Sequence, residues 1–268
     1  MFEEFRTAED KVNALLNSDS VHGMVCLGPP GVGKTFTVTK MLESTKTPYF
    51  CISSYSTPLQ FYINWYQNRD KVMVFDDAAG VLDNKKIRSM LLAGLWSTNG
   101  EPREVQYNSS TSKLEEQMVP TRFSVENKII WCTNKIPKGN NAIKSRCYFQ
   151  KFDWTFEQKQ KLFKDIFKLK ETPVPVQEFL MKKCTRFCIN FDFRLINKVT
   201  DYFKICHNNW LKLAESEVEY DDDLYLVEEL ANKYKGERAI KEFVKRTGMS
   251  RRTYFVYKRK IGLSRKYL

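Results

Sequence analysis

GPPGVGKT, residues 28–35, is the stretch of this sequence that decides the fold. It follows an apolar run, 21–27, that predicts a short buried strand, and it precedes TFTVTKMLES, which predicts a helix. Strand, glycine-rich turn and helix in this order turn the pattern G-x-x-x-x-G-K-[ST] into a phosphate-binding loop. Main-chain N–H groups and the helix N-terminus can then face a polyphosphate. We therefore expect a nucleoside triphosphate to be bound by Gly28, Pro29, Pro30, Gly31, Val32, Gly33, Lys34 and Thr35.

Two side chains of this loop have distinct expected roles. Lys34 would place a positive charge at the β and γ phosphates, and the Thr35 hydroxyl would ligate Mg²⁺. The alternative is an ordinary Gly/Pro turn with a solvated lysine. The strand and the helix on either side argue against that alternative.

Basic residues are unevenly distributed along the 268 residues. The chain has 44 Lys and Arg against 32 Asp and Glu, a formal net charge of +12. Residues 233–268 alone hold 13 basic and two acidic side chains, and the segment just before them, 215–229, carries eight acids. This asymmetry indicates an anion-binding C-terminal domain, most often one for nucleic acid.

The remaining composition bears on the compartment. Seven scattered cysteines without paired metal-ligand spacing predict reduced thiols. No apolar run approaches the roughly 18 residues of a membrane span, and the acidic amphipathic N-terminus is unlike a signal peptide. We expect a cytoplasmic protein without a membrane partner, located in the host cytoplasm if a phage encodes it.

The order of the predicted elements divides the chain into domains. Strands and helices alternate up to residue 154, which predicts an α/β domain, 1–154, with a parallel sheet and helices on both faces. From 155 the strands stop, and 155–214 reads as a small all-α domain whose last predicted helix, 192–214, is long. An acidic linker, 215–223, and a basic domain, 224–268, complete the prediction.

Two further strands end in polar residues. KVMVFDD, residues 71–77, places Asp76 and Asp77 at the carboxyl end of a buried strand, where the ligand sites of parallel sheets lie. Asp76 would hold Mg²⁺ through water, and Asp77 would orient or deprotonate the attacking water. KIIWCTN, residues 128–134, ends in Asn134, which would hold that water beside the γ-phosphate. Taken alone, Asn134 would cap a turn, but its position after the other two motifs favours the site.

Together these motifs, Ser145-Arg146-Cys147 and the helical domain resemble the AAA+ ATPases over roughly residues 21–210. The resemblance implies ATP and Mg²⁺ as cofactors, and a homo-oligomer, ring or open spiral, with ATP at subunit interfaces. KSRC, 144–147, is similar to the SRC motif of clamp loaders, which implies that Arg146 acts in trans as an arginine finger. The alternative for Arg146 is a surface arginine paired with an acid. NFDFRLINKV, 190–199, is similar to the sensor 2 helix of the lid and implies that Arg194 senses the γ-phosphate.

The chain departs from the AAA+ pattern at two places. Asp77 stands where many members have Glu, and the shorter side chain leaves the rate of hydrolysis open. The insert 99–126 resembles a hairpin of some helicases and initiator-like ATPases, from which Arg103, Lys113 and Arg122 could touch DNA. A solvated hairpin without a ligand is the alternative.

The basic C-terminus, residues 238–263, predicts helix, tight turn and helix, with Ser250 as the N-cap of the second helix and 224–235 as a supporting helix. It resembles a helix-turn-helix, whose second helix enters the major groove of duplex DNA. Base or phosphate contacts are predicted for Arg251, Arg252, Thr253 and Tyr254, and backbone contacts for Lys258, Arg259 and Lys260. A solvated basic helix that docks on the ATPase or on RNA is the alternative.

These observations predict an oligomeric DNA-binding AAA+ ATPase. ATP binding and hydrolysis would drive assembly or remodelling on DNA at replication initiation or helicase loading, with a helicase or another replication protein as partner. The short chain suits a phage or another mobile element. The alternatives are a clamp-loader ATPase subunit, a superfamily 3-like viral helicase, and a non-hydrolysing DNA-binding regulator that ATP switches. ATP rather than GTP follows from the resemblance alone.

Overall fold

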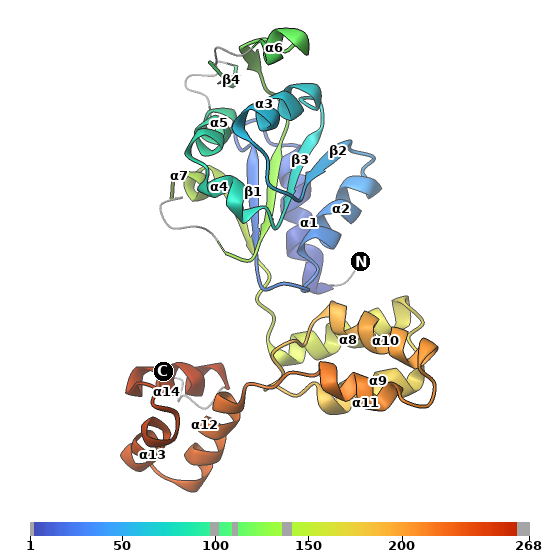
Figure 1. Ribbon diagram of the computed structural model, residues 1–268, viewed down its shortest axis with the longest axis vertical. Helices are drawn as coiled ribbons and strands as arrows, with labels where there is room; N and C mark the ends of the chain where they lie inside the picture. Colours follow the sequence, from blue (N-terminus) through green and yellow to red (C-terminus); the bar gives the residue numbers. More distant parts are fainter. Residues whose placement is uncertain (1–2, 97–101, 109–111, 136–140, 262–268) are drawn as a thin grey trace. The chain divides into compact units, whose positions relative to one another are not determined.

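The computed structural model describes residues 3–96, 102–108, 112–135 and 141–261, in two compact units. Unit 1 is residues 1–153 and unit 2 is residues 154–268 (Figure 1). No helix among the described residues is both long enough and apolar enough to cross a membrane.

A parallel sheet forms the centre of unit 1. Its strands, among the described residues, are β1 (Gly23–Leu27), β2 (Tyr49–Ile52), β3 (Val72–Asp76), β6 (Ile129–Thr133) and β7 (Cys147–Lys151), in the order β2-β3-β6-β1-β7. The middle strands are apolar along nearly their whole length because helices cover both faces. All the strands run the same way, so their carboxyl ends share one edge of the sheet.

Helices cover both faces of this sheet (Figure 1). One face carries α1 (Glu3–Leu16) and α2 (Lys34–Ser44), and the other carries α3 (Pro58–Gln67), α4 (Ala79–Asp83) and α5 (Lys85–Leu95). The short helix α7 (Asn141–Ser145) precedes β7. The α/β domain predicted from the alternation of elements is confirmed.

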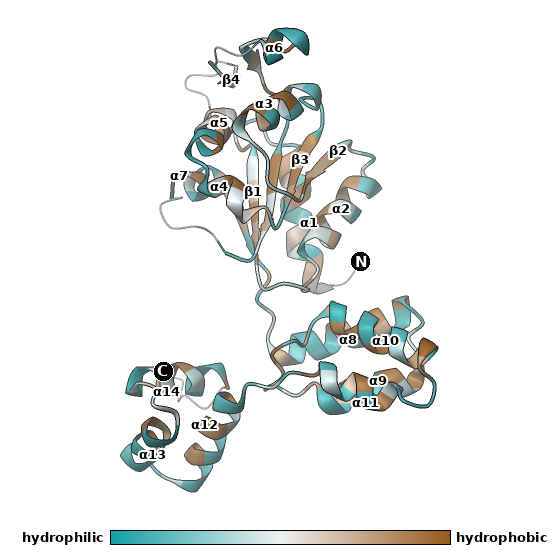
Figure 2. Ribbon diagram, in the orientation of Figure 1, coloured by the Kyte–Doolittle hydropathy of each residue, from teal (hydrophilic) through white to brown (hydrophobic). Residues whose placement is uncertain are grey.

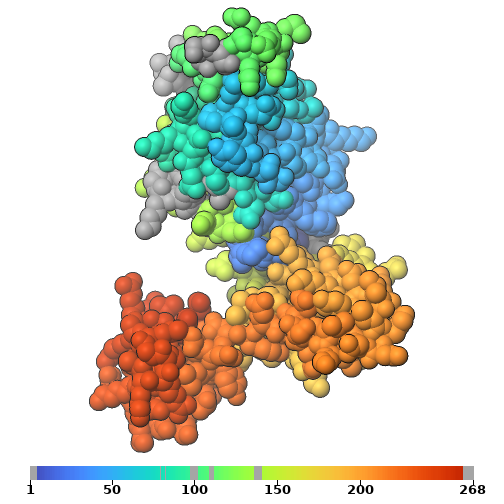
Figure 3. All heavy atoms as spheres, viewed as in Figure 1, coloured from blue at the N-terminus to red at the C-terminus, as the bar shows by residue number. Residues whose placement is uncertain are grey.

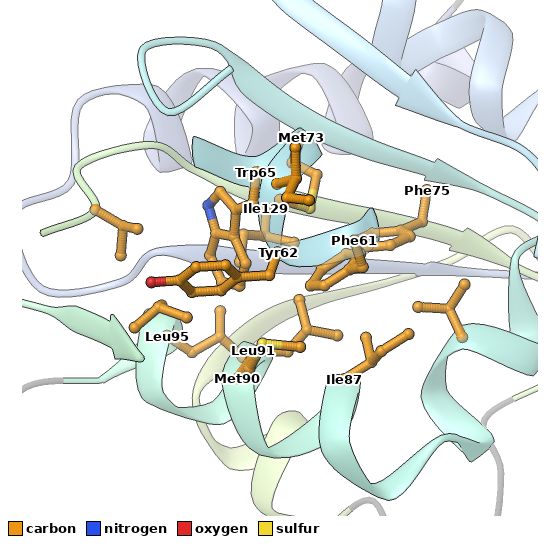
Figure 4. Close-up of a cluster of buried hydrophobic side chains, with 14 of the residues drawn as sticks. Phe61, Tyr62, Trp65, Met73, Phe75, Ile87, Met90, Leu91, Leu95 and Ile129 are labelled. Atoms are coloured by element: carbon orange, nitrogen blue, oxygen red, sulfur yellow. The ribbon is translucent and has the colours of Figure 1, made fainter. Parts of the chain in front are cut away.

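The core between α3, α5 and the sheet is rich in aromatic side chains (Figure 4). Phe61 and Trp65 of α3 are buried in this core. Phe75 of β3 stacks on Trp131 of β6, with the two ring centroids 5.5 Å apart. Aromatic side chains bury large areas and pack in defined geometries. This core fixes β3 and β6 side by side, and with them the polar residues at their carboxyl ends.

The insert between β3 and β6 lies at the opposite, amino edge of the sheet. It consists of α6 (Lys113–Glu116) and an antiparallel pair, β4 (Glu104–Gln106) and β5 (Arg122–Ser124). Figure 3 shows it in green at one end of unit 1. Asn99 and Gly100, which open the predicted insert, lie outside the described residues.

Arg103 corrects one sequence prediction, because it does not face solvent. Its side chain is only 7% exposed and donates from Nη1 to the carbonyl oxygens of Gly94, at 2.6 Å, and Asn127, at 3.2 Å. A guanidinium enclosed in this way joins the insert to α5 and the start of β6. Arg103 is therefore a structural residue, and its prediction as a DNA contact is wrong. Arg122 is exposed and pairs with Glu104 across the two insert strands.

The first part of unit 2 is formed by four helices among the described residues: α8 (Phe156–Leu169), α9 (Val174–Lys183), α10 (Phe193–Ile205) and α11 (Trp210–Glu217). Each carries both apolar and polar segments (Figure 2). Thr155 and Gln158 form a capping box at the start of α8. The long helix predicted over 192–214 is two helices, because the chain turns at 206–209, where the N–H of Asn209 donates to the Cys206 carbonyl.

The C-terminal helical unit follows, formed by α12 (Asp222–Lys233), α13 (Glu237–Thr247) and α14 (Arg251–Lys260). The predicted acidic linker, 215–223, is mostly helix. Glu215 and Glu217 belong to the last turn of α11 and pair with Lys183 and Lys198. Asp221 accepts a hydrogen bond from the Leu224 N–H as the N-cap of α12. Acidic side chains favour the N-terminus of a helix, so the acids from Asp221 to Asp223 mark the start of α12.

Candidate nucleotide site

The loop 28–35 connects β1 to α2 at the carboxyl edge of the sheet. Gly31 and Gly33 have φ values of 73° and 86°, a conformation that L residues with a Cβ rarely adopt. Gly28 has a different requirement: a Cβ at this position would lie 2.6 Å from the carbonyl oxygen of Phe152. The glycines therefore give the loop its curvature and its close packing on the chain that leaves β7.

Lys34, the first residue of α2, is turned back over this loop. Its side chain is only 7% exposed, and Nζ donates to the carbonyl oxygens of Gly28 at 2.9 Å and Pro29 at 2.7 Å. Nζ also lies 2.9 Å from the Asn134 Oδ1, which accepts a third hydrogen bond. The ammonium group thus sits where the glycine loop and the end of β6 meet, and a buried cation there favours an anionic ligand.

Thr35 and Asp76 provide the oxygen atoms for a cation. The Thr35 hydroxyl donates to the Asp76 Oδ1 at 2.6 Å, which joins the start of α2 to the end of β3. Hydroxyl and carboxylate oxygens are ligands that Mg²⁺ accepts, and Mg²⁺ usually retains several waters alongside one or two carboxylates and phosphates. This pair fits Mg²⁺, and the loop and Lys34 fit a polyphosphate.

Asp77 and Asn134 complete the site from two neighbouring strands. The Asn134 Nδ2 donates to the Asp77 Oδ1 at 3.0 Å, while its Oδ1 accepts from Lys34. Asp77 has a φ of 52°, an uncommon conformation for a residue with a Cβ, and both Asp77 and Asn134 are exposed. Asn134 therefore bridges the cation of the loop and the second carboxylate of β3, next to solvent.

Arg146 lies at the other edge of the sheet from this cluster. The next residue, Cys147, is paired with Gly23 at the amino end of β1, whereas the phosphate-binding loop follows Leu27. At about 3.3 Å per residue, Arg146 is roughly 13 Å or more from its own loop along the strand direction. The half-buried side chain donates from Nη1 to the Ala142 carbonyl at 3.4 Å and has no acidic partner among the described residues.

Arg194 belongs to unit 2, where it is exposed in the first turn of α10. The Asp192 carboxylate caps this turn by accepting from the N–H groups of Arg194 and Leu195. Within unit 1, the structure therefore brings together Lys34, Thr35, Asp76, Asp77 and Asn134, and it does not add Arg146 to this cluster.

The predicted DNA contacts on α14 differ in their surroundings. Tyr254 is 2% exposed and packs on Phe243 with ring centroids 5.5 Å apart, so its prediction as a DNA contact is corrected: it is a core residue. The Thr253 hydroxyl lies 3.0 Å from the Ser250 hydroxyl at the helix N-cap, and Arg251 pairs with Glu237 at 2.5 Å. Arg252, Arg259 and Lys260 are exposed, and Lys258 is half-buried.

Sequence reasoning missed one residue that shapes the nucleotide site. The N–H of Phe152 donates to the Leu27 carbonyl at 2.7 Å, which extends the β1–β7 pairing to the start of the loop. Its carbonyl oxygen then occupies the space that a Gly28 side chain would need. No motif marks Phe152, because its role comes from a strand pairing between distant parts of the chain.

Comparison with known proteins places this geometry in a fold class. No family model and no curated protein matches the sequence, but solved structures match the fold. RuvB of Thermotoga maritima, a Holliday junction branch migration motor, has a TM-score of 0.54 at 13% identity, covering 98% of this chain and 88% of RuvB. NtrX from Brucella abortus, solved in complex with ATP, has a TM-score of 0.52 at 12% identity, covering 98% of this chain and 69% of NtrX. The chain has the AAA+ P-loop ATPase fold.

The predicted fold class is therefore confirmed. The chain has a parallel sheet, a layer of helices on each face of that sheet and a helical C-terminal region. At these identities the likeness concerns the fold.

Proposed function

We propose that this protein is an AAA+ ATPase that works as a homo-oligomer and couples ATP binding and hydrolysis to assembly or remodelling on duplex DNA. The observation that carries the ATPase part is the bonded cluster at the carboxyl edge of the sheet. Lys34, Asn134 and Asp77 form one chain of hydrogen bonds, and Thr35 and Asp76 form a second pair beside it. Phosphoryl transfer requires a cation that binds the phosphates, a pair of metal ligands and a pair of residues that position water. Lys34 can be the first, Thr35 and Asp76 the second, and Asp77 and Asn134 the third.

Each residue of the cluster has a defined task in this proposal. ATP and Mg²⁺ supply the transferable phosphoryl group and the charge that neutralises it. Lys34 binds the β and γ phosphates in place of the carbonyls that it now contacts, and Thr35 and Asp76 hold Mg²⁺. Asp77 would orient or deprotonate the attacking water, and Asn134, which donates to Asp77, would hold that water beside the γ-phosphate.

The position of Arg146 supports a site shared between subunits. It cannot serve the loop of its own chain from the amino edge of the sheet, and no acidic side chain of the described residues engages it. A neighbouring copy would bring Arg146 to a bound ATP as an arginine finger. Such a residue stabilises the charge of the transition state and raises the rate of hydrolysis by about 10³-fold or more. Arg194 would contact the γ-phosphate from unit 2.

The DNA part of the proposal is supported by charge and by the C-terminal helical unit. Residues 233–268 hold 13 basic against two acidic side chains, and α13 and α14 are joined by Gly248, whose φ is 70°, and by the N-cap Ser250. The turn between these two helices supports our reading of them as a helix-turn-helix, whose second helix would enter the major groove. RuvB, a motor that acts on Holliday junctions, has the same fold at low identity. We place the activity at replication initiation or helicase loading, with a helicase or another replication protein as partner.

The test is ATP hydrolysis by the wild type, by Arg146→Ala, by Lys34→Ala and by a mixture of the two variants, with and without duplex DNA. We expect each variant alone to be inactive. The mixture should recover turnover, because an Arg146→Ala subunit keeps its own loop and receives the finger of a Lys34→Ala neighbour. Duplex DNA should stimulate the wild type. Normal hydrolysis by Arg146→Ala would refute the shared site.

A second candidate is a DNA-binding regulator that ATP assembles without being hydrolysed. Asp77 favours it, because its carboxylate is one methylene shorter than the Glu of many AAA+ members. Turnover by the wild type would exclude this candidate. If turnover is absent with and without DNA while ATP still changes the oligomeric state, the regulator is the better account, and Asp77→Glu should then introduce hydrolysis.

A further inference from the structure

Helix α14 has two opposite faces of different composition. Tyr254, Tyr257 and Ile261 face the core of the C-terminal helical unit, where Tyr254 is 2% and Ile261 6% exposed. Successive residues of an α-helix are rotated by about 100°, so residues 252, 255, 256 and 259 lie on the side directly away from this core. We call this side the outer face of α14; it consists of Arg252, Phe255, Val256 and Arg259.

Two apolar side chains occupy the centre of the outer face. Phe255 is 37% and Val256 40% exposed, although residues of this kind are normally buried. The two side chains are adjacent and have polar neighbours, so they form a small apolar strip that a ligand can cover. The packing of this small unit explains why position 254 holds an aromatic residue, but it does not require apolar residues at the outward positions 255 and 256.

The arginines at the two ends of the outer face are available to a ligand. Among the described residues, neither Arg252 nor Arg259 has an acidic partner, and both are exposed. Arg251, one residue before Arg252, differs from them because Glu237 holds it at 2.5 Å. The two unpaired arginines are seven residues apart, about 10 Å along the helix axis, which corresponds to roughly three base pairs of DNA.

Polar side chains flank the outer face on both sides. By helical rotation, Arg251 and Lys258 lie along one flank, and Thr253 and Lys260 lie along the other. A helix in the major groove has a phosphate backbone on each side and base edges in front of it. Helix α14 matches that arrangement. It has a basic side chain on each flank, and its outer face has an apolar centre with an arginine at each end.

We propose that the outer face of α14 reads a short duplex DNA sequence in which two guanines about three base pairs apart enclose at least one thymine. Arg252 and Arg259 would each donate two hydrogen bonds to a guanine, and Phe255 and Val256 would contact the thymine 5-methyl group. This inference rests on the proposed DNA binding and adds the bases that are read. Duplex RNA fits less well, because the major groove of A-form RNA is too deep and narrow for a helix.

The experiment uses the full chain and a pool of duplex DNA with a randomised centre. After selection, the preferred duplex is compared with duplexes in which uracil replaces one thymine, which removes only the 5-methyl group. We expect uracil to weaken wild-type binding about three- to fourfold at the contacted position. Val256→Ala should lose this discrimination, and Arg252→Ala or Arg259→Ala should lose about tenfold in affinity and relax the preference for one guanine.

Two controls separate the outcomes. Val244→Ala removes an equally exposed valine from α13, outside the outer face, and should keep the preference for thymine. Lys260→Ala should weaken binding to all duplexes alike. If the wild type binds duplex DNA but does not distinguish thymine from uracil, or if the arginine variants weaken all sequences equally, the base-reading face is refuted while DNA binding stands. Absence of duplex binding, or tighter binding to duplex RNA, overturns both proposals.

Discussion

Two cations, Lys34 and Arg103, are buried to the same extent at opposite edges of one sheet. Each side chain is 7% exposed, and each donates to two backbone carbonyl oxygens. Around Lys34 stand two glycines with positive φ and an asparagine exposed to solvent. Around Arg103 stand the last turn of α5 and Asn127, whose side chain accepts a hydrogen bond from Trp65.

The difference shows that burial of a cation does not identify its role. The carbonyls that hold Lys34 belong to a loop with exposed prolines, so a ligand can take their place. The Gly94 carbonyl that holds Arg103 is one of the last in α5, and such carbonyls have no partner within their helix. The first cation is placed to bind an anion, and the second stabilises the end of a helix.

The largest expected effect is on turnover by Lys34→Ala. Without the ammonium group the phosphates lose their main cationic partner, and we expect ATP hydrolysis to fall by about 100-fold or more. The free energy of unfolding should change by less than about 1 kcal/mol, because two of the three acceptors of Lys34 belong to the exposed residues Pro29 and Asn134, which water can reach. Steady-state hydrolysis and chemical denaturation measure the two quantities. A strong loss of stability with turnover intact would reverse the comparison.

Arg103→Met should show the opposite behaviour. It leaves the carbonyls of Gly94 and Asn127 without a donor in a closed environment, and we expect a loss of about 2–4 kcal/mol in unfolding free energy. Affinity for duplex DNA should not change. The matched control is Arg122→Met, which removes an exposed arginine of the same insert and should cost less than about 0.5 kcal/mol. Weaker DNA binding by folded Arg103→Met would restore the DNA role.

A smaller effect is expected for Gly94→Ala, beside Arg103. An added Cβ would lie 2.4 Å from the Trp65 ring, whose Nε1 is itself fixed by a 3.1 Å hydrogen bond to Asn127. We expect a loss of about 1–3 kcal/mol. Gly80→Ala is the matched control, since nothing lies within 4 Å of its added Cβ and alanine is the better helix former by roughly 1 kcal/mol. Equal stability of the two variants in thermal or chemical unfolding would contradict this account of the amino edge.

The contrast also shows how far the sequence could predict this molecule. Lys34, Thr35, Asp76 and Asn134 each follow or begin an element in a fixed pattern, so the sequence predicted that they would meet at the carboxyl edge of a parallel sheet. Arg103 stands in no pattern. Its partners, Gly94 and Asn127, are placed only by the return of the insert to the sheet.

The same limit applies to the C-terminal helical unit. The apolar spacing predicted α13 and α14, and Ser250 caps α14 as expected by accepting from the Thr253 N–H. Which side of α14 faces inward depends on α12 and α13, so Tyr254 was predicted as a contact although it packs on Phe243. Phe255 and Val256, which look like core residues by type, are the exposed ones.

The smallest expected effect concerns the pH dependence of stability at the amino edge, through His22. The Lys128 Nζ lies 3.2 Å from the His22 Nδ1, which can accept a hydrogen bond only while the imidazole is neutral. Burial first, and then the charges of Arg103 and Lys128, lower the pKa of His22 from 6.5 to about 4. Between these two values the unfolded chain binds a proton that the folded chain does not, so protonation favours unfolding there.

Stability from His22 is therefore fully present above about pH 6.5 and is lost as the pH falls toward 4. His22→Asn should reduce the drop in unfolding free energy between pH 7 and pH 5, measured by chemical denaturation in matched buffers. His207→Asn, an exposed histidine of unit 2, should leave that drop unchanged. An unchanged pH slope for His22→Asn would mean that burial and the charges of Arg103 and Lys128 do not lower the pKa of His22 in solution. In that case the amino edge would not be the closed, positively charged environment that we describe. The two edges of the sheet would then differ only in the geometry of the phosphate-binding loop.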